Sequence, residues 1–390
     1  MIDKQPIIDT SQSKELDFLL ALLREENKSE EIIPSKEINW SYFLKLVKHH
    51  RVCPLVYLKL KDTPDAVPSN VIEVLFQEYK KNTFKMLQLT GEMETLDKVF
   101  KGNDIETLCL KGPPVAYDLF GDISLRMSKD LDILVREEEL EKAESILFSL
   151  GYEKEKVSTV LNEIKWRHHH IAYYHPNKKI QVEVHWRLQP RPMKRTSFQE
   201  LWSRKRESQV TQHPISFIGK EDLLLYLISH GARHGWFRLR WLKDIDQIVR
   251  KKDINYKYFS ELAIKYQQKN LVGQAFQLAN LFFQTPVHEE LRHIVNTKVA
   301  NQLAEKAIPF IKEMVQFHVH PQPKNLEKSY KNYLFSIKTK RQKCNFLIIL
   351  FYPNSLDERT FRLPKNLYFL YFLLRPFLWS WRKLKKSVLF

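Results

Sequence analysis

Two aspartates stand one residue apart at the start of an apolar run, in the stretch SLRMSKDLDILV at residues 124–135. Branched aliphatic residues favour a buried β-strand, and the side chains of a strand alternate between its two faces. Asp130 and Asp132 are therefore expected side by side on one face, while the aliphatic residues that alternate with them form the core face. Neighbouring carboxylates repel each other and raise each other's pKa. The spacing thus predicts a bound cation, and hard oxygen ligands suit Mg²⁺.

A third acidic residue lies on a later stretch with strand character, IQVEVHW at residues 180–186. By the same alternation, Glu183 and His185 share one face of that strand. If this strand lies beside the aspartate strand, Glu183 completes a triad with Asp130 and Asp132 that has room for one or two metal ions. Such a triad suits phosphoryl or nucleotidyl transfer. His185 either orients Glu183 or contacts substrate, or else makes a structural hydrogen bond.

The hydrophobic period changes along the chain. The first hundred residues show the three- and four-residue spacing of amphipathic helices, and this spacing returns from Glu221 to about residue 317. Between them lie short apolar strands, a KGPP turn, a helix opened by proline, and a hairpin with PNKK at its turn. These patterns predict an α+β fold with a small strand-rich domain, flanked by helical N-terminal and C-terminal regions. The expected units are a helical N-terminal region, a core with the sheet, a helical domain, and a linker with an aromatic and basic C-terminal segment, at residues 1–100, 101–192, 193–319 and 320–390.

Length and charge bound the class of protein. The chain has 390 residues, more than one hydrophobic core usually spans, and a formal net charge of +17. This charge favours anionic partners such as nucleotides, nucleic acid or a lipid surface. The three cysteines are far apart, which argues against a disulfide framework and against a cysteine-based zinc site. Because no secretory signal and no apolar stretch of about 18 residues stands out, we expect a cytoplasmic protein.

Four stretches, LCLKGPPVAYDLF, SLRMSKDLDILV, VEVHWRL and SHGARHGWFRLRWLKDIDQIV, resemble the bacterial family labelled uncharacterised nucleotidyltransferase, a branch of the DNA-polymerase-beta-like nucleotidyltransferase superfamily. The resemblance extends from about residue 38 to about residue 250. It implies a small mixed sheet with flanking helices, and a metal-dependent transfer of a nucleoside monophosphate from an NTP such as ATP. Asp130, Asp132 and Glu183 would be the metal ligands, with Glu183 acting as the base or beside it. The implied acceptor is an unknown small molecule, peptide or protein, and relatives near genes for modified peptides point to a role in peptide tailoring.

The turn before the first helix of this core departs from the superfamily's pattern, in which glycine and serine bind the triphosphate. Here Lys111 and Gly112 are followed by two prolines, which remove two backbone N–H donors. Lys111 as a point charge, and Arg126 with Ser128 as a guanidinium fork and a hydroxyl, are the expected compensating contacts to phosphate. The alternative for Lys111 and Arg126 is ordinary surface charge. The weakened turn also leaves open a catalytically inactive protein that binds nucleotide.

Two other groups of polar residues have milder interpretations. Asp244 lies in a helical stretch and is expected to be structural, or to pair with an arginine that positions substrate. The three histidines at residues 168–170 are more typical of a half-exposed strand face than of a zinc site, because no cysteine or HExxH motif accompanies them.

The C-terminal stretch LPKNLYFLYFLLRPFLWSWRKLKK combines aromatic and basic residues. It is either a helix packed on the body and broken near Pro376, or a segment that lies in a membrane interface at the inner membrane face. A membrane-surface adaptor is therefore a second alternative function. No helix-turn-helix or stacking motif supports a nucleic-acid partner.

Overall fold

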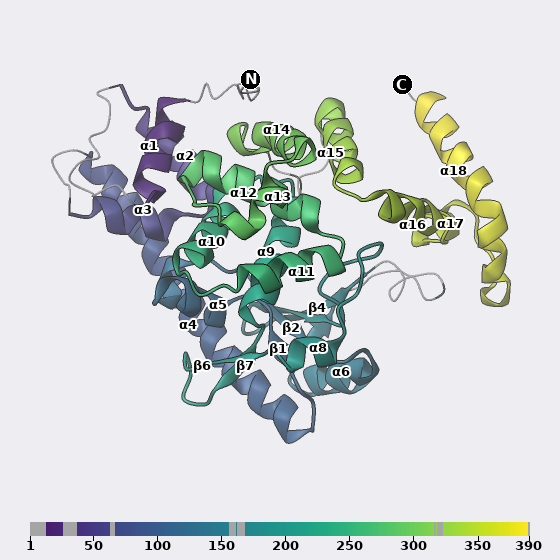
Figure 1. The fold of residues 1–390 in the computed structure, drawn as a ribbon. Helices are drawn as coiled ribbons and strands as arrows, with labels where there is room; N and C mark the ends of the chain where they lie inside the picture. The colour runs from purple at the N-terminus through teal and green to yellow at the C-terminus, as the bar shows by residue number, and fades with distance from the viewer. Residues whose placement is uncertain are drawn as a thin grey trace.

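A mixed sheet of seven strands organises the structure, a computed structural model that describes residues 13–25, 37–62, 67–155, 161, 168–315, 317 and 323–388. The strands are β1 (Leu108–Cys109), β2 (Leu131–Leu134), β3 (Glu153–Lys154), β4 (His170–His175), β5 (Ile180–His185), β6 (Arg206–Ser208) and β7 (Ile215–Phe217). Helices pack around the sheet and extend beyond it (Figure 1). The fold class is α+β with helical flanks, as predicted.

Helices precede, interrupt and follow the strands. Before β1 come α1 (Lys14–Leu23), α2 (Trp40–His50), α3 (Cys53–Leu60) and α4 (Ser69–Gly102). Between the strands lie α5 (Pro113–Phe120), η2 (Ile123–Leu125), η3 (Glu137–Glu139), α6 (Leu140–Ser149) and α8 (Phe198–Trp202). After β7 come α9 (Lys220–Arg233), α10 (Leu239–Arg250), α11 (Tyr256–Lys265), α12 (Lys269–Phe283), η4 (Glu289–Leu291), α13 (Arg292–Val295) and α14 (Lys298–Lys312). The C-terminal elements are α15 (Lys324–Ser336), α16 (Lys340–Leu350), α17 (Ser355–Thr360), η5 (Lys365–Leu370) and α18 (Tyr371–Val388).

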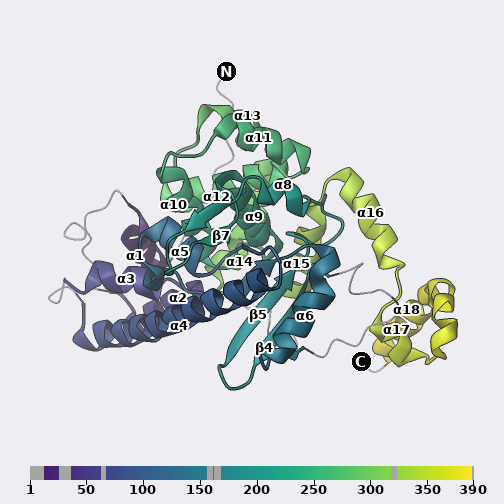
Figure 2. The same cartoon turned by 90° about the horizontal axis from the view of Figure 1, so that it is seen from below.

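The strand order places the two acidic stretches next to each other. The order is β3-β4-β5-β2-β1-β7-β6. β2 runs parallel to β5 and β1 runs parallel to β7, while the other neighbouring pairs are antiparallel. The β4–β5 hairpin turns at residues 176–179, where PNKK predicted a turn. The long helix α4 runs past this hairpin (Figure 2), and Lys85 and Gln88 donate to backbone carbonyls of its turn at 3.2 and 2.8 Å.

The β6–β7 hairpin was not predicted from the sequence. It lies inside the expected helical domain at residues 193–319, before the helical spacing returns at Glu221. The two strands have three residues each, and they join the sheet where Cys109 of β1 pairs with Phe217 of β7. Strands this short carry too little alternation to stand out in a sequence. The formation of this hairpin therefore depends on the pairing of β7 with β1, which is about a hundred residues earlier in the chain.

The helices after β7 form a closely packed layer beside the sheet. A close approach at Gly231 of α9 allows this packing, because a Cβ atom there would lie 2.3 Å from the ring of Trp236. The Trp236 side chain is fully buried. Any larger residue at position 231 would displace this ring and the start of α10 with it.

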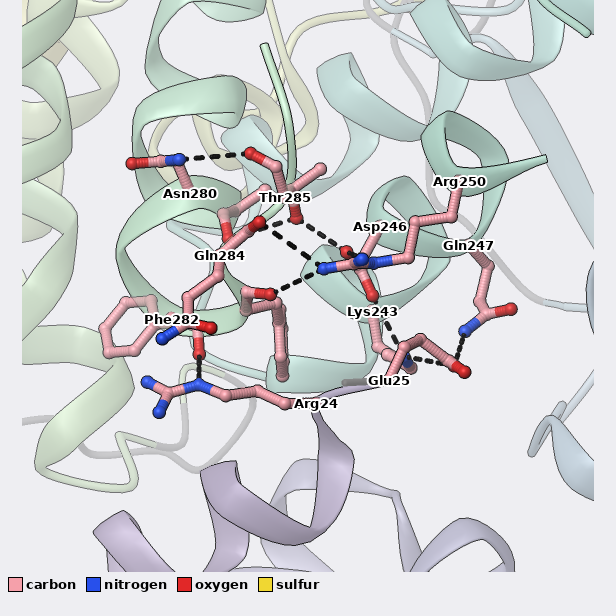
Figure 3. Close-up of polar contacts among 12 residues, drawn as sticks. Arg24, Glu25, Lys243, Asp246, Gln247, Arg250, Asn280, Phe282, Gln284 and Thr285 are labelled. Atoms are coloured by element: carbon pink, nitrogen blue, oxygen red, sulfur yellow. Dashed lines mark hydrogen bonds and ion pairs between the residues drawn. The ribbon is translucent and has the colours of Figure 1, made fainter. Parts of the chain in front are cut away.

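A buried polar network joins α1 to this layer (Figure 3). Asp246 of α10 is fully buried, and its carboxylate accepts from Lys243 at 2.9 Å, from Arg250 at 2.7 Å and from Thr285 at 2.7 Å. Lys243 also donates to Glu25, just after α1, at 2.9 Å. Each oxygen of the Asp246 carboxylate therefore has a partner, which is the usual condition for a buried charge.

The helices α17 and α18 lie apart from the rest of the chain in both views, with α18 at the far edge (Figures 1 and 2), whereas α15 packs on the helical layer, where Tyr333 donates to the carbonyl of Ala232 at 2.8 Å. The expected linker at residues 320–328 lies partly outside the described residues, and α15 begins at Lys324. The expected break near Pro376 is absent, because α18 is continuous from Tyr371 to Val388. Pro376 stands close to the start of α18, where it removes only one hydrogen bond near the first turn. Among the described helices, none is both long enough and apolar enough to cross a membrane.

Candidate functional site

The parallel pairing of β2 with β5 brings the predicted acidic side chains together. In this register Asp132 stands opposite Glu183, and Leu134 stands opposite His185. Residues that are directly opposite on neighbouring strands place their side chains on the same face of the sheet. The alternation predicted from the sequence therefore holds for Glu183 and His185, and Asp132 joins them across the strand pair.

The side chains form a compact cluster. His185 Nε2 lies 3.1 Å from Asp132 Oδ1 and 3.4 Å from Glu183 Oε2, so the imidazole bridges the two carboxylates. Lys111 Nζ lies 3.0 Å from the same Asp132 Oδ1. One ligand atom from each of Asp132, Glu183 and His185 lies within 4.8 Å of the others. The cluster thus combines two carboxylates with an imidazole and an ammonium group.

Asp130 lies just before β2, at the edge of this cluster. It does not belong to the group of ligand atoms within 4.8 Å, although its charge interacts with those of Asp132 and Glu183. Burial, followed by repulsion from Asp132, raises the pKa of Asp130 to about 6. The structure therefore places Asp130 at the edge of the cluster, outside the close group of Asp132, Glu183 and His185.

The cations of the cluster keep its central carboxylate ionised. Burial alone would raise the pKa of Asp132, but Lys111 and the hydrogen bond from His185 hold it well below its usual range. Burial alone would likewise lower the pKa of His185, and its hydrogen bonds to Asp132 and Glu183 raise it instead. Burial alone would lower the pKa of Lys111 as well, but the combined attraction of Asp132 and the other acidic groups around it raises the pKa. The site is therefore a set of fixed, mutually stabilising charges.

The donor set fits a divalent cation. Asp132 Oδ2 is buried and has no hydrogen-bond partner among the described residues, whereas Oδ1 accepts from both His185 and Lys111. A buried carboxylate oxygen without a partner is costly, and a metal ion would satisfy it. Two carboxylates are ligands that Mg²⁺ accepts.

The predicted phosphate turn has the backbone that its glycine requires. Gly112 has φ +88°, a conformation that other residues rarely adopt, and α5 starts directly after it with two prolines. Of the first three residues of this helix, only Val115 retains an N–H group. The helix start is therefore poor in donors, as expected, while Lys111 reaches the carboxylates from the same turn.

Arg126 and Ser128, the other two predicted phosphate contacts, make hydrogen bonds within the protein. Arg126 is 1% exposed, and two of its nitrogens each donate to Asp244 at 3.0 Å. This is the pairing with an arginine that was one of the two expectations for Asp244. Ser128 donates to the backbone carbonyl of Asp130 at 3.3 Å. Both residues therefore shape the loop that leads into β2.

Two histidines that the sequence analysis placed on a half-exposed strand face, His169 and His170, lie beside the cluster. His170 stands opposite His185 in the β4–β5 pair, and its Nε2 lies 3.6 Å from Glu183 Oε2. His169 precedes β4 and so is not bound by strand alternation, and its Nε2 accepts from Arg233 at 2.8 Å. Both lie against His185, with ring centroids 4.9 and 5.4 Å away. The PNKK turn carried the signal, because a hairpin closed at residues 176–179 sets His170 opposite His185.

An excess of positive charge lies on the Asp130 side of the site. Arg51 follows α2 and is attracted by Asp130. Arg238 and Arg240 stand at the start of α10, and Nε of each is buried without a hydrogen-bond partner in the described part of the chain. Burial, followed by repulsion from Arg51, lowers the pKa of Arg238 to about 10. Arginines held this close to one another favour a bound anion.

One comparison with known proteins identifies a family. The model of the family described as uncharacterised nucleotidyltransferase matches residues 36–284, which include every residue of the cluster. Neither the curated proteins nor the solved structures contain a match to the chain.

Proposed function

Because the chain belongs to the uncharacterised nucleotidyltransferase family, we propose that it transfers a nucleoside monophosphate from an NTP to an acceptor in an Mg²⁺-dependent reaction. The family match supports a nucleotidyltransferase in general. One observation supports the metal-dependent form: the parallel register that sets Asp132 beside Glu183 and leaves Asp132 Oδ2 without a partner among the described residues.

In this proposal Asp132 and Glu183 hold the metal, and Asp130 supplies a third carboxylate, with one or two ions bound. Bound Mg²⁺ would neutralise phosphate oxygens and activate the attacking group of the acceptor. His185 orients Asp132 through the hydrogen bond to Oδ1, which leaves Oδ2 free for the ion. The imidazole therefore acts through the carboxylate rather than on the nucleotide.

The triphosphate requires cations in place of the missing serine turn. Lys111 is fixed beside Asp132 and remains charged, because the pKa of its ammonium group is raised. Arg51 and Arg238 add positive charge on the Asp130 side. We assign phosphate contacts to these residues and give Arg126 a positioning role through Asp244.

The reaction forms a bond from the acceptor to the α-phosphorus and releases pyrophosphate. Few backbone N–H groups are available at the start of α5, so positioning of the triphosphate depends on side chains. This same feature favours the second candidate, a protein that binds nucleotide without transferring it.

The test is a titration of the purified protein with ATP, GTP, CTP and UTP, with and without Mg²⁺. We expect Mg²⁺-dependent binding of at least one nucleotide, weakened about 100-fold or more in the Asp130→Asn/Asp132→Asn double variant, since ligand loss removes several kcal/mol of charge stabilisation. Asp118→Asn is the matched control, because Asp118 is a partly buried carboxylate paired with Arg206 at 2.9 Å outside the site.

The outcomes separate the candidates. Equal binding by the double variant and the wild type would reject this carboxylate cluster as the nucleotide site. Binding that depends on the cluster, with no pyrophosphate released in the presence of acceptor mixtures, would favour the non-catalytic candidate. Absence of binding to all four nucleotides would overturn the proposal.

A further inference from the structure

The last three helices form a unit that is held together by its own contacts. We call residues 340–388, with α16, α17, η5 and α18, the C-terminal lobe. Its α17 and α18 lie apart from the body of the molecule (Figure 2), whereas α16 contacts the body, where Gln342 donates to the carbonyl of Gln267 at 3.5 Å. Asp357 of α17 is fully buried and forms ion pairs with two residues of α18, Arg375 and Arg382, the latter at 2.8 Å. Tyr371 donates to the carbonyl of Phe361 at 2.8 Å. These contacts fix which side of α18 faces the lobe.

The opposite side of α18 is apolar and exposed. Leu373, Phe377, Trp381 and Leu384 are 71%, 72%, 64% and 63% exposed. Their spacing of four, four and three residues sets them on one face of a helix. Arg375, which pairs with Asp357, is 7% exposed and lies about half a helical turn from this stripe. The stripe therefore points away from Asp357. A continuous exposed stripe of large apolar residues marks a binding surface rather than ordinary surface variation.

The charge of the lobe indicates what covers this stripe. Residues 340–388 contain eleven lysines and arginines and two acidic residues, a difference of 11 − 2 = +9. One of the two acidic residues, Asp357, is already paired inside the lobe. Lys383 lies over the ring of Trp379 at 3.9 Å, which sets a cation and an exposed tryptophan together beside the stripe. Two copies of the lobe would repel each other, so a second copy of the chain is a poor occupant.

We propose that α18 of the C-terminal lobe binds the surface of an anionic membrane, with the stripe of Leu373, Phe377, Trp381 and Leu384 in the boundary between headgroups and acyl chains. Apolar residues on one face, tryptophans and an excess of cations are the features of helices that lie in this interface. The helix lies along the surface, because no described helix is long and apolar enough to cross it. The lobe also lies beyond residues 36–284, so this inference is independent of the family match and of the nucleotide site.

The experiment is sedimentation of the full chain with vesicles of phosphatidylglycerol and phosphatidylcholine, or of phosphatidylcholine alone. We expect the wild type to sediment with the anionic vesicles, less so as salt is raised, and to stay in solution with the neutral ones. The Phe377→Glu/Trp381→Glu variant should lose about tenfold or more in vesicle affinity, because it places two charges in the apolar stripe.

Phe84→Glu is the matched control, since Phe84 is an aromatic residue of α4 that is 68% exposed and outside the lobe. It should sediment like the wild type. A Lys383→Glu/Lys385→Glu variant tests the charge without changing the stripe, and it should lose affinity for the anionic vesicles. Thermal melts of each variant verify that the body remains folded.

Three results would overturn the inference. They are equal sedimentation with neutral and anionic vesicles, unchanged sedimentation of the stripe variant, and a dimer in solution that the stripe variant abolishes. Nucleotide titrations of the same variants distinguish this inference from the proposed function, because substitutions in α18 should leave nucleotide affinity unchanged.

Discussion

Two buried aspartates, Asp132 in the sheet and Asp246 in the helical layer, differ in how their charge is satisfied. Asp246 accepts from Lys243, Arg250 and Thr285, and both of its oxygens have partners (Figure 3). Asp132 is equally buried, but its two donors share one oxygen and the other oxygen has none among the described residues. A satisfied buried carboxylate stabilises the fold, whereas an unsatisfied one beside further carboxylates is the feature on which the proposed metal site rests.

The largest effect should come from the satisfied carboxylate. Asp246→Asn should lower the free energy of unfolding by on the order of 3 kcal/mol, because it removes part of the partner of the buried Lys243 and of the partly buried Arg250. Thermal and chemical denaturation measure the loss. At a temperature where the variant remains folded, its nucleotide affinity should equal that of the wild type. An unchanged melting temperature would contradict the structural role given to this network.

Substitution of Asp130 should raise the free energy of unfolding rather than lower it. The pKa of Asp130 is raised to about 6 by burial and by Asp132. The pKa of this carboxyl group is about 4 in the unfolded chain and about 6 in the folded chain, so the folded chain holds the proton more tightly. The free energy of unfolding therefore falls as the pH rises through about 4 and above. Asp130→Asn carries no such charge. Without metal, it should therefore be more stable than the wild type above pH 6, by on the order of 2 kcal/mol.

The measurement is a series of thermal melts of both proteins in chelator across the pH range. The advantage of Asp130→Asn should shrink toward zero as the pH falls to about 4, where the wild-type carboxyl is also neutral. A constant difference at every pH would show that the effect of the substitution does not arise from ionisation.

The smallest effect should come from adding Mg²⁺ without nucleotide. A ligand that binds only the folded chain stabilises it by about 1.4 kcal/mol at ten times its dissociation constant. We expect the melting temperature of the wild type to rise with Mg²⁺ and to return with chelator. Asp132→Asn should abolish the rise, and Asp246→Asn should retain it from a lower starting point. A rise of equal size in Asp132→Asn would place the ion elsewhere.

How far the sequence predicted the site depends on whether a feature is local. Alternation along a strand is a property of the backbone, so the shared face of Glu183 and His185 followed from their spacing alone. The hairpin turn at residues 176–179 was also recognised, although its consequence for His170 was not drawn. By contrast, the sequence did not identify Arg126 as the partner of Asp244, which is more than a hundred residues away in the chain. No local pattern records which carboxylate a given arginine meets.

The sequence by itself determined the chemistry available to this protein: the spaced aspartates, the third carboxylate, the lysine before a proline-rich turn, and an aromatic, basic C-terminus. Tertiary structure decided how these parts are used. Parallel pairing of β2 with β5 brought Asp132 to Glu183, and the ion pairs of Asp357 turned one face of α18 outward. The physical reason is that propensity and alternation act over a few residues, whereas burial, charge pairing and strand partners are settled between segments far apart in the chain.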